Sequence, residues 1–303
     1  MNPKDYGTVG VIGLGSMGLG MAQSLKRAGF DVIGCDVSAA ARARFAPDGD
    51  HATGSAADLA SCEAIVSVVI NADQVEAILF GSDGLAKSMR RGAIVIACST
   101  VAPAFAKSTA EALAARGLLY LDAPISGGQA KAAAGALTVM ASGTGAAFAK
   151  AGPLMDAMAE TVYRLGDEPG QGSSVKMINQ LLAGVHIAAA SEAMALGIKV
   201  GIDPQTLYDV ICKSAGCSWM FENRVPRILA GAYQPPQSSV NIFTKDLGIV
   251  LDTARRQTFP TPLAAAAYQL FTMAAAAGMG ADDDSSVVRV YERLSDIVLP
   301  KGQ

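Results

Sequence analysis

The segment that decides the fold is Thr8-Val9-Gly10-Val11-Ile12-Gly13-Leu14-Gly15-Ser16-Met17-Gly18. An apolar run over Thr8–Ile12 leads into a glycine-rich turn that opens a helical pattern. In such a strand–turn–helix unit, Gly13 permits the tight turn, Gly15 lets the backbone approach a pyrophosphate, and Gly18 lets the helix pack on the strand. A glycine-rich turn can also serve packing alone, but this context favours a dinucleotide site. We therefore expect the cofactor to contact Gly13, Leu14, Gly15, Ser16, Met17 and Gly18.

Asp36 extends this prediction. It ends the second apolar run, 18 residues after Gly18, where a carboxylate can accept hydrogen bonds from the adenosine ribose hydroxyls. A carboxylate there repels the 2′-phosphate of NADP, and the nearest arginines, Arg42 and Arg44, lie a turn or more into the next helical pattern. The sequence therefore predicts NAD as the cofactor, with NADP less suited.

Strand and helix signals alternate through the first half of the chain. Short apolar runs lie at Thr8–Ile12, Asp31–Cys35, Ala64–Val69, Ala93–Cys98 and Leu118–Asp122, with helical segments at Met17–Ala28, Gln74–Leu79 and Ala104–Arg116. Two further strands are expected at Ala136–Ser142 and Thr161–Leu165. This alternation predicts an α/β, Rossmann-type doubly wound sheet with helices on both faces.

The second half carries helical patterns only. They cover Ser173–Val200, Pro204–Ser214, Trp219–Ala230, Ile242–Gln257 and Leu263–Ala277. We therefore expect two domains, a nucleotide-binding domain over residues 1–165 and an all-α domain over residues 166–303.

Composition narrows the partners. The net charge is −3, from 24 basic and 27 acidic residues, which argues against a nucleic-acid footprint or a polybasic membrane patch. The uncharged stretch Leu263–Ala281 is alanine-rich and includes polar residues, so we interpret it as a buried helix rather than a membrane span. The N-terminus lacks an apolar run of signal-peptide length. These features predict a cytoplasmic protein with no nucleic-acid or membrane partner.

The five cysteines are Cys35, Cys62, Cys98, Cys212 and Cys217. Their number is odd and none forms a CxxC pair, so we expect reduced thiols in a reducing compartment. The two histidines, His51 and His186, are too few and too far apart for a histidine-based metal cluster. No metal site is expected.

Gly172, Lys176 and Asn179 are spaced by four and three residues, which places them on one face near the start of a long predicted helix. A lysine there can act as general base toward a hydroxyl, provided that its pKa is lowered by partial burial and by a neighbouring positive charge. The alternative is an ordinary solvated lysine. The flanking glycine and asparagine favour the catalytic interpretation, with Lys176 and Asn179 as the catalytic residues.

Three ordered motifs carry a family resemblance over essentially the whole chain. They are Val11–Gly18 continuing to Ala22, Asp122–Gly128, and Gly172–Asn179. Together they resemble the β-hydroxyacid dehydrogenase family, which includes 3-hydroxyisobutyrate dehydrogenase and tartronate semialdehyde reductase. The resemblance implies hydride transfer from a small, carboxylate-bearing hydroxy acid to NAD.

The resemblance also implies roles for residues outside the catalytic helix. Ser126, Gly127 and Gly128 would form a loop that receives the substrate carboxylate. Thr100, in Ser99-Thr100 after a predicted strand, would lie near the nicotinamide. Lys245, in a Lys245-Asp246-Leu247 segment, would reach the cofactor or the substrate from the helical domain.

Four segments of the second half resemble the L-threonate dehydrogenase subgroup. They are Gln180–Ala188, Ser218–Arg224, Phe243–Gly248 and Asp283–Ser285. This implies oxidation of L-threonate to 2-oxo-tetronate, with Trp219 and Phe221 either lining the substrate pocket or belonging to the core. Position 179 is asparagine, the residue of the wider family, where the subgroup implies histidine.

Other functions therefore stay open. They are reduction of tartronate semialdehyde, oxidation of 3-hydroxyisobutyrate, and nucleotide sensing without chemistry. Alanine-rich helical surfaces allow helices to approach closely, and members of the family commonly form dimers or tetramers. We therefore expect a homodimer or homotetramer.

Overall fold

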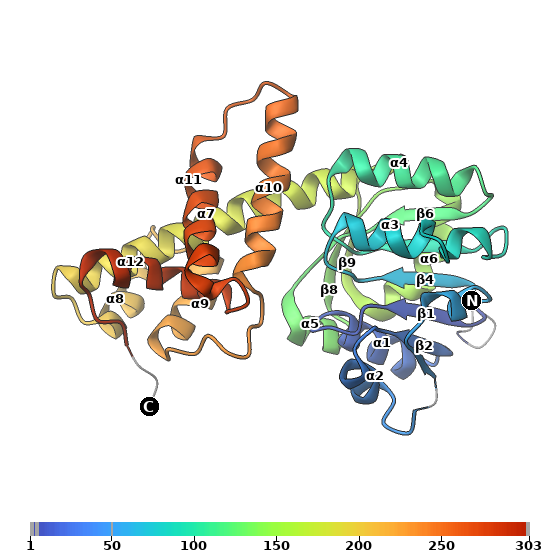
Figure 1. The fold of residues 1–303 in the computed structure, drawn as a ribbon, viewed down its shortest axis with the longest axis horizontal. Coiled ribbons are helices and arrows are strands. Elements are labelled where there is room, and N and C mark those ends of the chain that lie inside the picture. Colours follow the sequence, from blue (N-terminus) through green and yellow to red (C-terminus); the bar gives the residue numbers. More distant parts are fainter. Residues whose placement is uncertain (1–2, 4–5, 50, 301–303) are drawn as a thin grey trace. The chain divides into compact units, whose positions relative to one another are not determined.

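The computed structural model describes residues 3, 6–49 and 51–300. The chain forms two compact units, residues 1–176 and residues 177–303. The division falls inside the long helix α7 (Gln171–Lys199), whose first six residues belong to the first unit. Figure 1 shows the α/β unit and the helical unit joined by α7.

The first unit is built on a six-stranded parallel sheet in the order β3-β2-β1-β4-β5-β6. The strands are β1 (Val9–Ile12), β2 (Val32–Cys35), β3 (Ala52–Thr53), β4 (Ala64–Ser67), β5 (Ile94–Ala97) and β6 (Leu119–Asp122). This strand order is that of a dinucleotide-binding doubly wound sheet, whose ligands bind at the carboxyl ends of the strands where the order reverses. The predicted fold class is confirmed, and β1 and β4 flank the reversal.

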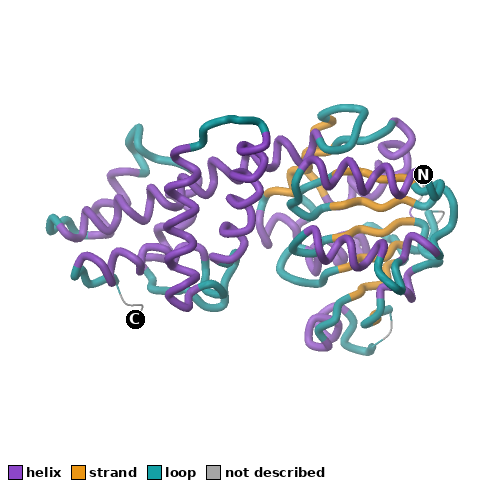
Figure 2. Tube along the Cα trace, turned by 45° about the horizontal axis from the view of Figure 1, so that its top comes forward, coloured by secondary structure: helices purple, strands orange, loops and turns teal. Residues whose placement is uncertain are grey.

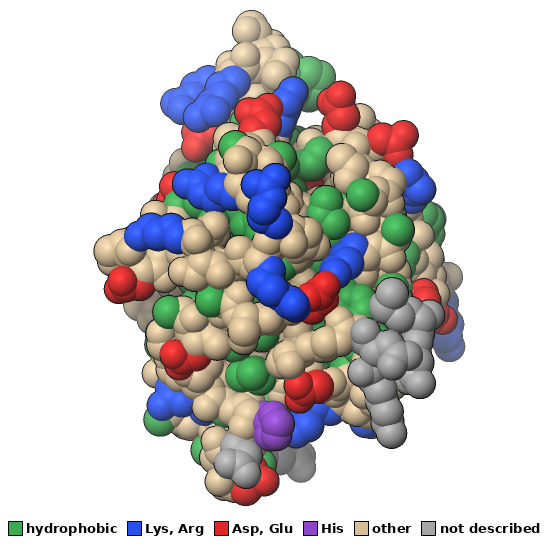
Figure 3. Space-filling model, turned by 90° about the vertical axis from the view of Figure 1, so that its right-hand side faces the viewer, with side chains coloured by type: hydrophobic (Ala, Val, Ile, Leu, Met, Phe, Trp, Pro, Cys, Tyr) green, Lys and Arg blue, Asp and Glu red, His purple; other side chains and the backbone are tan. Residues whose placement is uncertain are grey.

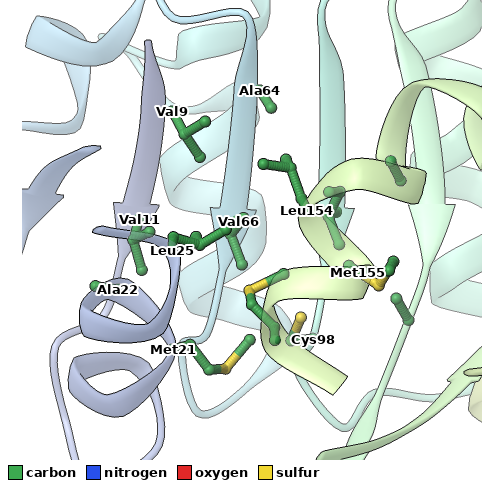
Figure 4. Close-up of a cluster of buried hydrophobic side chains, with 14 of the residues drawn as sticks. Val9, Val11, Met21, Ala22, Leu25, Ala64, Val66, Cys98, Leu154 and Met155 are labelled. Carbon is green, nitrogen blue, oxygen red and sulfur yellow. The ribbon is translucent and has the colours of Figure 1, made fainter. Parts of the chain in front are cut away.

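Helices cover both faces of this sheet. On one face lie α1 (Gly18–Arg27), α2 (Ala39–Phe45) and α6 (Gly145–Met158), and on the other α3 (Ala72–Phe80) and α4 (Pro103–Ala114). In Figure 4, Val9 and Val11 of β1 meet Leu25 of α1 and Leu154 of α6. Because both faces are covered, the central strands β1, β4 and β5 are buried throughout, which explains why they read as continuous apolar runs.

A smaller, three-stranded sheet follows in the order β7-β8-β9. Its strands are β7 (Ile125–Ser126), β8 (Leu137–Ala141) and β9 (Ala159–Arg164), and α5 (Gly128–Ala134) connects the first two. The last two strands match the runs expected at Ala136–Ser142 and Thr161–Leu165. The sequence does not predict the two-residue β7 or the seven-residue α5, because neither is long enough to show a strand or helix periodicity of apolar residues.

The second unit is helical, as Figure 2 shows. After α7 come α8 (Pro204–Ile211), α9 (Trp219–Leu229), α10 (Val240–Arg256), α11 (Pro262–Ala274) and α12 (Val288–Ser295). The core joins Ile187 of α7, Phe243 and Leu247 of α10 and Phe271 of α11, and the rings of Phe243 and Phe271 stack with centroids 5.2 Å apart. Helix α11 buries a single apolar face, and the stretch after it turns at Gly278, where φ is +88°.

Of the described helices, α7 alone has the length and apolar composition to cross a membrane. However, 44% of its most apolar stretch is buried inside the protein, and Ala183 and Ile187 lie in the core of the second unit. The core helices of soluble proteins can be equally long and apolar, so α7 is only weak evidence for a membrane span.

Charged side chains of both signs are mixed on the face drawn in Figure 3, where blue Lys and Arg lie among red Asp and Glu. This mixing agrees with the nearly balanced composition of the chain.

Candidate active site

The glycine-rich turn follows β1 and packs against the segment after β4. A Cβ on Gly13, whose φ is +93°, would lie 2.8 Å from the carbonyl oxygen of Val68, and a Cβ on Gly18 would lie 1.8 Å from the carbonyl oxygen of Gly13. No larger residue fits at either position. A Cβ on Gly15, by contrast, would meet nothing within 4 Å. The backbone at Gly15 is therefore open to a ligand, as close approach of a pyrophosphate requires.

Asp36, directly after β2, is tied to this turn. Its Oδ2 accepts a hydrogen bond from the backbone N–H of Leu14 at 2.8 Å, and its Oδ1 accepts one from the N–H of Ser38 at 2.8 Å. The Arg42 guanidinium bends back from α2 and donates to the carbonyl oxygen of Asp36 at 2.7 Å. Arg42 therefore lies closer to Asp36 than its position in the sequence suggested.

Thr100 lies three residues beyond the end of β5 and is half-buried. The preceding Ser99 is buried, and its hydroxyl donates to the carbonyl oxygen of Val69, after β4, at 2.7 Å. Since β1, β2, β4 and β5 are parallel, the glycine-rich turn, Asp36 and Thr100 all follow carboxyl ends at one edge of the sheet.

Asp122, the last residue of β6, anchors the start of α7 at this same edge. Its carboxylate accepts hydrogen bonds from the backbone N–H groups of Gly170 (2.9 Å) and Ser173 (2.8 Å) and from the hydroxyls of Ser173 (2.7 Å) and Ser142 (3.1 Å). Ser142 in turn accepts from the N–H of Gly172 at 2.9 Å. The free N–H groups that begin every helix are thus satisfied by β6 and by the residue after β8.

This anchor holds α7 tightly. A Cβ on Gly172 would lie 2.3 Å from the carbonyl oxygen of Met140, so only glycine permits the approach of the helix. Burial raises the pKa of Asp122, while its hydrogen bonds from Ser173, Gly170 and Ser142 act in the opposite direction. Sequence reasoning quoted Asp122 only as part of a motif and missed its role, although an acidic residue ending a buried strand is an available signal.

Lys176 lies one turn after this anchor and is buried, with 8% of its surface exposed. It is not the solvated lysine of the alternative interpretation. Because Ser173 is fixed to β6, the lysine is held within the first unit, on a helix that begins at the carboxyl edge of the sheet.

Asn179 and Lys245 are linked by two further side chains within the second unit. The amide of Asn179 donates to Oε1 of Gln180 at 3.0 Å, and the amide of Gln180 donates to Oδ2 of Asp246 at 2.5 Å. Nζ of Lys245 lies 2.6 Å from Oδ1 of Asp246, whose side chain is 1% exposed. The chain Asn179–Gln180–Asp246–Lys245 therefore joins α7 to α10, and Gln180 and Asp246 are members that sequence reasoning did not identify.

The expected carboxylate loop is a strand-to-helix turn. Ser126 ends β7 and Gly128 begins α5, so the expectation of an open loop is corrected at both ends. Gly127 and Gly128 adopt φ of +137° and +78°. A Cβ on Gly128 would meet nothing within 4 Å. Backbone groups at the start of α5 are thus accessible.

Two of the subgroup-like segments meet in a buried ion pair. Nε and Nη2 of Arg224, on α9, lie 2.7 and 2.8 Å from the two carboxylate oxygens of Asp284. Arg227, one turn later, pairs with Asp283 at 2.8 Å. Phe221 is buried and stacks on Tyr208, whereas Trp219 is 60% exposed. These motifs therefore contribute to the packing of the second unit, and of the two aromatic residues Phe221 belongs to its core while Trp219 lies at the surface.

Sequence models of two domains match this chain. The NAD-binding domain of 6-phosphogluconate dehydrogenase matches residues 8–166, and the NAD-binding domain of NADP-dependent 3-hydroxyisobutyrate dehydrogenase matches residues 170–291. The chain belongs to the β-hydroxyacid dehydrogenase family. It is a nicotinamide-dependent oxidoreductase that acts on CH–OH groups.

Individual members of this dehydrogenase family are similar over their full length. An L-threonate dehydrogenase from Cupriavidus necator is 56% identical, covering 93% of this chain and 95% of that protein. An L-threonate dehydrogenase from Escherichia coli is 48% identical, with 96% of each chain covered. The crystal structure of a 3-hydroxyisobutyrate dehydrogenase from Salmonella typhimurium superposes with a TM-score of 0.89 at 50% identity, covering 93% of this chain and 99% of that one.

Replacing Asp122 by alanine is expected to lower the free energy of unfolding by about 2–4 kcal/mol, since buried donors at the start of α7 lose their acceptor. Urea unfolding followed by circular dichroism measures the change. Asp156→Ala, at an exposed carboxylate of α6, serves as the control and is expected to stay within about 0.5 kcal/mol of the parent. Equal midpoints for the two variants would show that the anchor does not hold α7.

Proposed function

We propose that this dehydrogenase oxidises the C2 hydroxyl of L-threonate to 2-oxo-tetronate, with NAD as the hydride acceptor. The observation that carries the proposal is the buried Lys176, held one turn from the Asp122 anchor at the carboxyl edge of the sheet. The similarity to L-threonate dehydrogenases supports the choice of substrate.

The residues at this edge fit a dinucleotide. Gly13, Gly15 and Gly18, with the backbone of Leu14, Ser16 and Met17, would hold the pyrophosphate against the N-terminus of α1. Asp36 would accept hydrogen bonds from the ribose hydroxyls, and Thr100 would lie beside the nicotinamide. When bound, the nicotinamide ring accepts the hydride from the hydroxyl-bearing carbon.

Lys176 would act as general base. A buried ammonium group is poorly solvated, which favours its neutral form, and neutral Nζ can take the hydroxyl proton as the hydride leaves C2. In the reverse direction the ammonium returns the proton to the alkoxide oxygen. Asn179 would hold the reacting hydroxyl, and its orientation is set through Gln180 and Asp246.

The substrate carboxylate would bind to Ser126 and to the backbone N–H groups of Gly127 and Gly128. The left-handed φ values of Gly127 and Gly128 and the open space beside Gly128 support this role, because a Cβ on Gly128 would meet no atom within 4 Å. Lys245 would supply a positive charge toward the carboxylate or the cofactor. Its ion pair with Asp246 would fix the position of its ammonium group.

Oxidation of 3-hydroxyisobutyrate is the second candidate, with reduction of tartronate semialdehyde beside it. Asn179 favours these alternatives, because it is the residue expected in the wider family rather than in the threonate subgroup. The name of the similar Salmonella protein supports the same alternative.

The protein would work as a homodimer or homotetramer in the cytoplasm. Ile178 and Leu182 are exposed one turn apart on α7, and Leu196 near its end and Val200, the residue after it, are exposed as well. Such apolar pairs on a helix surface are typical of contacts between subunits. The five thiols are all free, which fits a reducing compartment. Light scattering of the purified protein tests the assembly, and a monomer would contradict it.

A panel of hydroxy acids tests the substrate. We expect NADH formation with L-threonate to exceed that with D-erythronate, D-glycerate and 3-hydroxyisobutyrate by about tenfold or more in kcat/KM, the range that one well-placed polar contact can supply. The assay follows NADH absorbance with each acid. A preference for 3-hydroxyisobutyrate would replace L-threonate as the substrate and retain the mechanism.

Replacing Lys176 by alanine is expected to lower kcat by about 10²–10⁴-fold, since the hydroxyl proton loses its acceptor. NAD affinity, measured by calorimetry, should stay unchanged. Lys199→Ala, at the exposed far end of the same helix, is the matched control and should retain turnover. Near-parental rates in Lys176→Ala would remove this lysine from the role of base.

Replacing Asp36 by alanine should lower the preference for NAD over NADP by about tenfold or more, which corresponds to ~1.4 kcal/mol per factor of ten. The repelling carboxylate is lost, while the Arg42 guanidinium remains beside the ribose position. The ratio of kcat/KM for the two cofactors measures the effect. Asp31→Asn, just before the opposite end of β2, is the control. An unchanged ratio would mean that another residue reads the ribose.

A further inference from the structure

Cys212, Cys217 and Glu222 converge in the second unit, and none of the three has a role in the proposed reaction. The two sulfur atoms and a carboxylate oxygen of Glu222 all lie within 4.8 Å of one another. Cys212 is the residue after α8, Cys217 precedes the N-cap of α9, and Glu222 lies in the first turns of α9. We propose that these three side chains form a Zn²⁺ site that ties the end of α8 to the start of α9.

The donor set selects the metal. Two thiolates and one carboxylate suit Zn²⁺, whereas Mg²⁺ and Ca²⁺ prefer oxygen ligands alone. In a tetrahedral site with Zn–S bonds of about 2.3 Å, the two sulfur atoms stand roughly 3.8 Å apart. The ligand atoms therefore need to close by about an ångström at most. Glu222 is exposed, so a water molecule can complete the fourth position.

The segment between the two cysteines is organised before any ion binds. The N–H of Cys212 donates to the carbonyl oxygen of Tyr208 at 3.0 Å, and the N–H of Cys217 donates to that of Ser214 at 3.1 Å. The Ser218 hydroxyl caps α9 by accepting from the N–H of Phe221 at 3.1 Å. Both thiols pack against the apolar cluster around Phe221 and Val225. Because these contacts fix the backbone, little conformational entropy is lost when an ion binds.

The proposal departs from the expectation of no metal site. That expectation rested on the absence of CxxC spacing. The two cysteines are separated by four residues and meet because α8 ends just before Cys212 and α9 begins just after Cys217. The proposed Zn²⁺ site uses no residue of the proposed active site, so it can be tested independently of the proposed reaction.

Titration of the reduced, full-length protein with Co²⁺ tests the site, without NAD or hydroxy acid. We expect one Co²⁺ per chain, with a thiolate-to-cobalt charge-transfer band and the visible bands of tetrahedral cobalt. Added Zn²⁺ should displace Co²⁺ and so remove both the charge-transfer band and the visible bands. The double variant C212S/C217S should lose the charge-transfer band. Glu222→Gln should keep the band but bind Co²⁺ at least about tenfold more weakly, because loss of a residue that only hydrogen-bonds to a metal ligand already lowers metal affinity by about 10–100-fold.

Asp209→Asn is the matched control, because this exposed carboxylate on α8 lies outside the cluster. It should bind Co²⁺ as the parent does. Absence of the charge-transfer band in the parent, or its persistence in C212S/C217S, would overturn the proposal. If the double variant fails to fold, Glu222→Gln carries the test alone, and an unchanged affinity would overturn the assignment.

Discussion

The buried carboxylate of Asp122 connects the sheet to α7, the helix on which Lys176 lies. It ends β6, and it accepts the hydrogen bonds that the first turn of α7 cannot make internally. An unsatisfied helix start buried at this depth would cost several kcal/mol, so the contact fixes both the position of α7 and the rotation of the helix about its axis. Lys176 follows one turn later, and its burial depends on that rotation.

The dinucleotide side of the same edge depends on steric exclusion. Gly13 and Gly18 leave no room for a Cβ, and the resulting turn brings the N–H of Leu14 to the carboxylate of Asp36. Both oxygens of this carboxylate are therefore held by backbone N–H groups of the protein itself. The Arg42 guanidinium donates to the carbonyl oxygen of the same residue, so a positive and a negative group lie together after β2.

Within the helical unit, buried charged side chains are paired with partners of opposite charge or with hydrogen-bond donors. Asp246 forms an ion pair with Lys245 and accepts a hydrogen bond from Gln180, and Asp284 forms a bidentate ion pair with Arg224. Breaking a buried pair is costly even where the pair itself adds little net stability. The segments that resemble the threonate subgroup therefore supply the buried ion pairs of this unit.

The sequence alone determined the parallel, doubly wound class of the sheet and the helical nature of the second half of the chain. Buried parallel strands need continuous apolar runs, and the glycine-rich turn admits few alternatives, so both leave a local signal. The sequence also pointed to Lys176 and Asn179, because helical spacing is short-range. Only the tertiary structure decided the contacts between residues far apart in the chain: Asp122 with Ser173, Gln180 with Asp246, and Arg224 with Asp284. Such pairs follow from how elements pack, and packing has no periodicity that one sequence can display. The same reason explains why the meeting of Cys212, Cys217 and Glu222 appears only once α8 and α9 are folded.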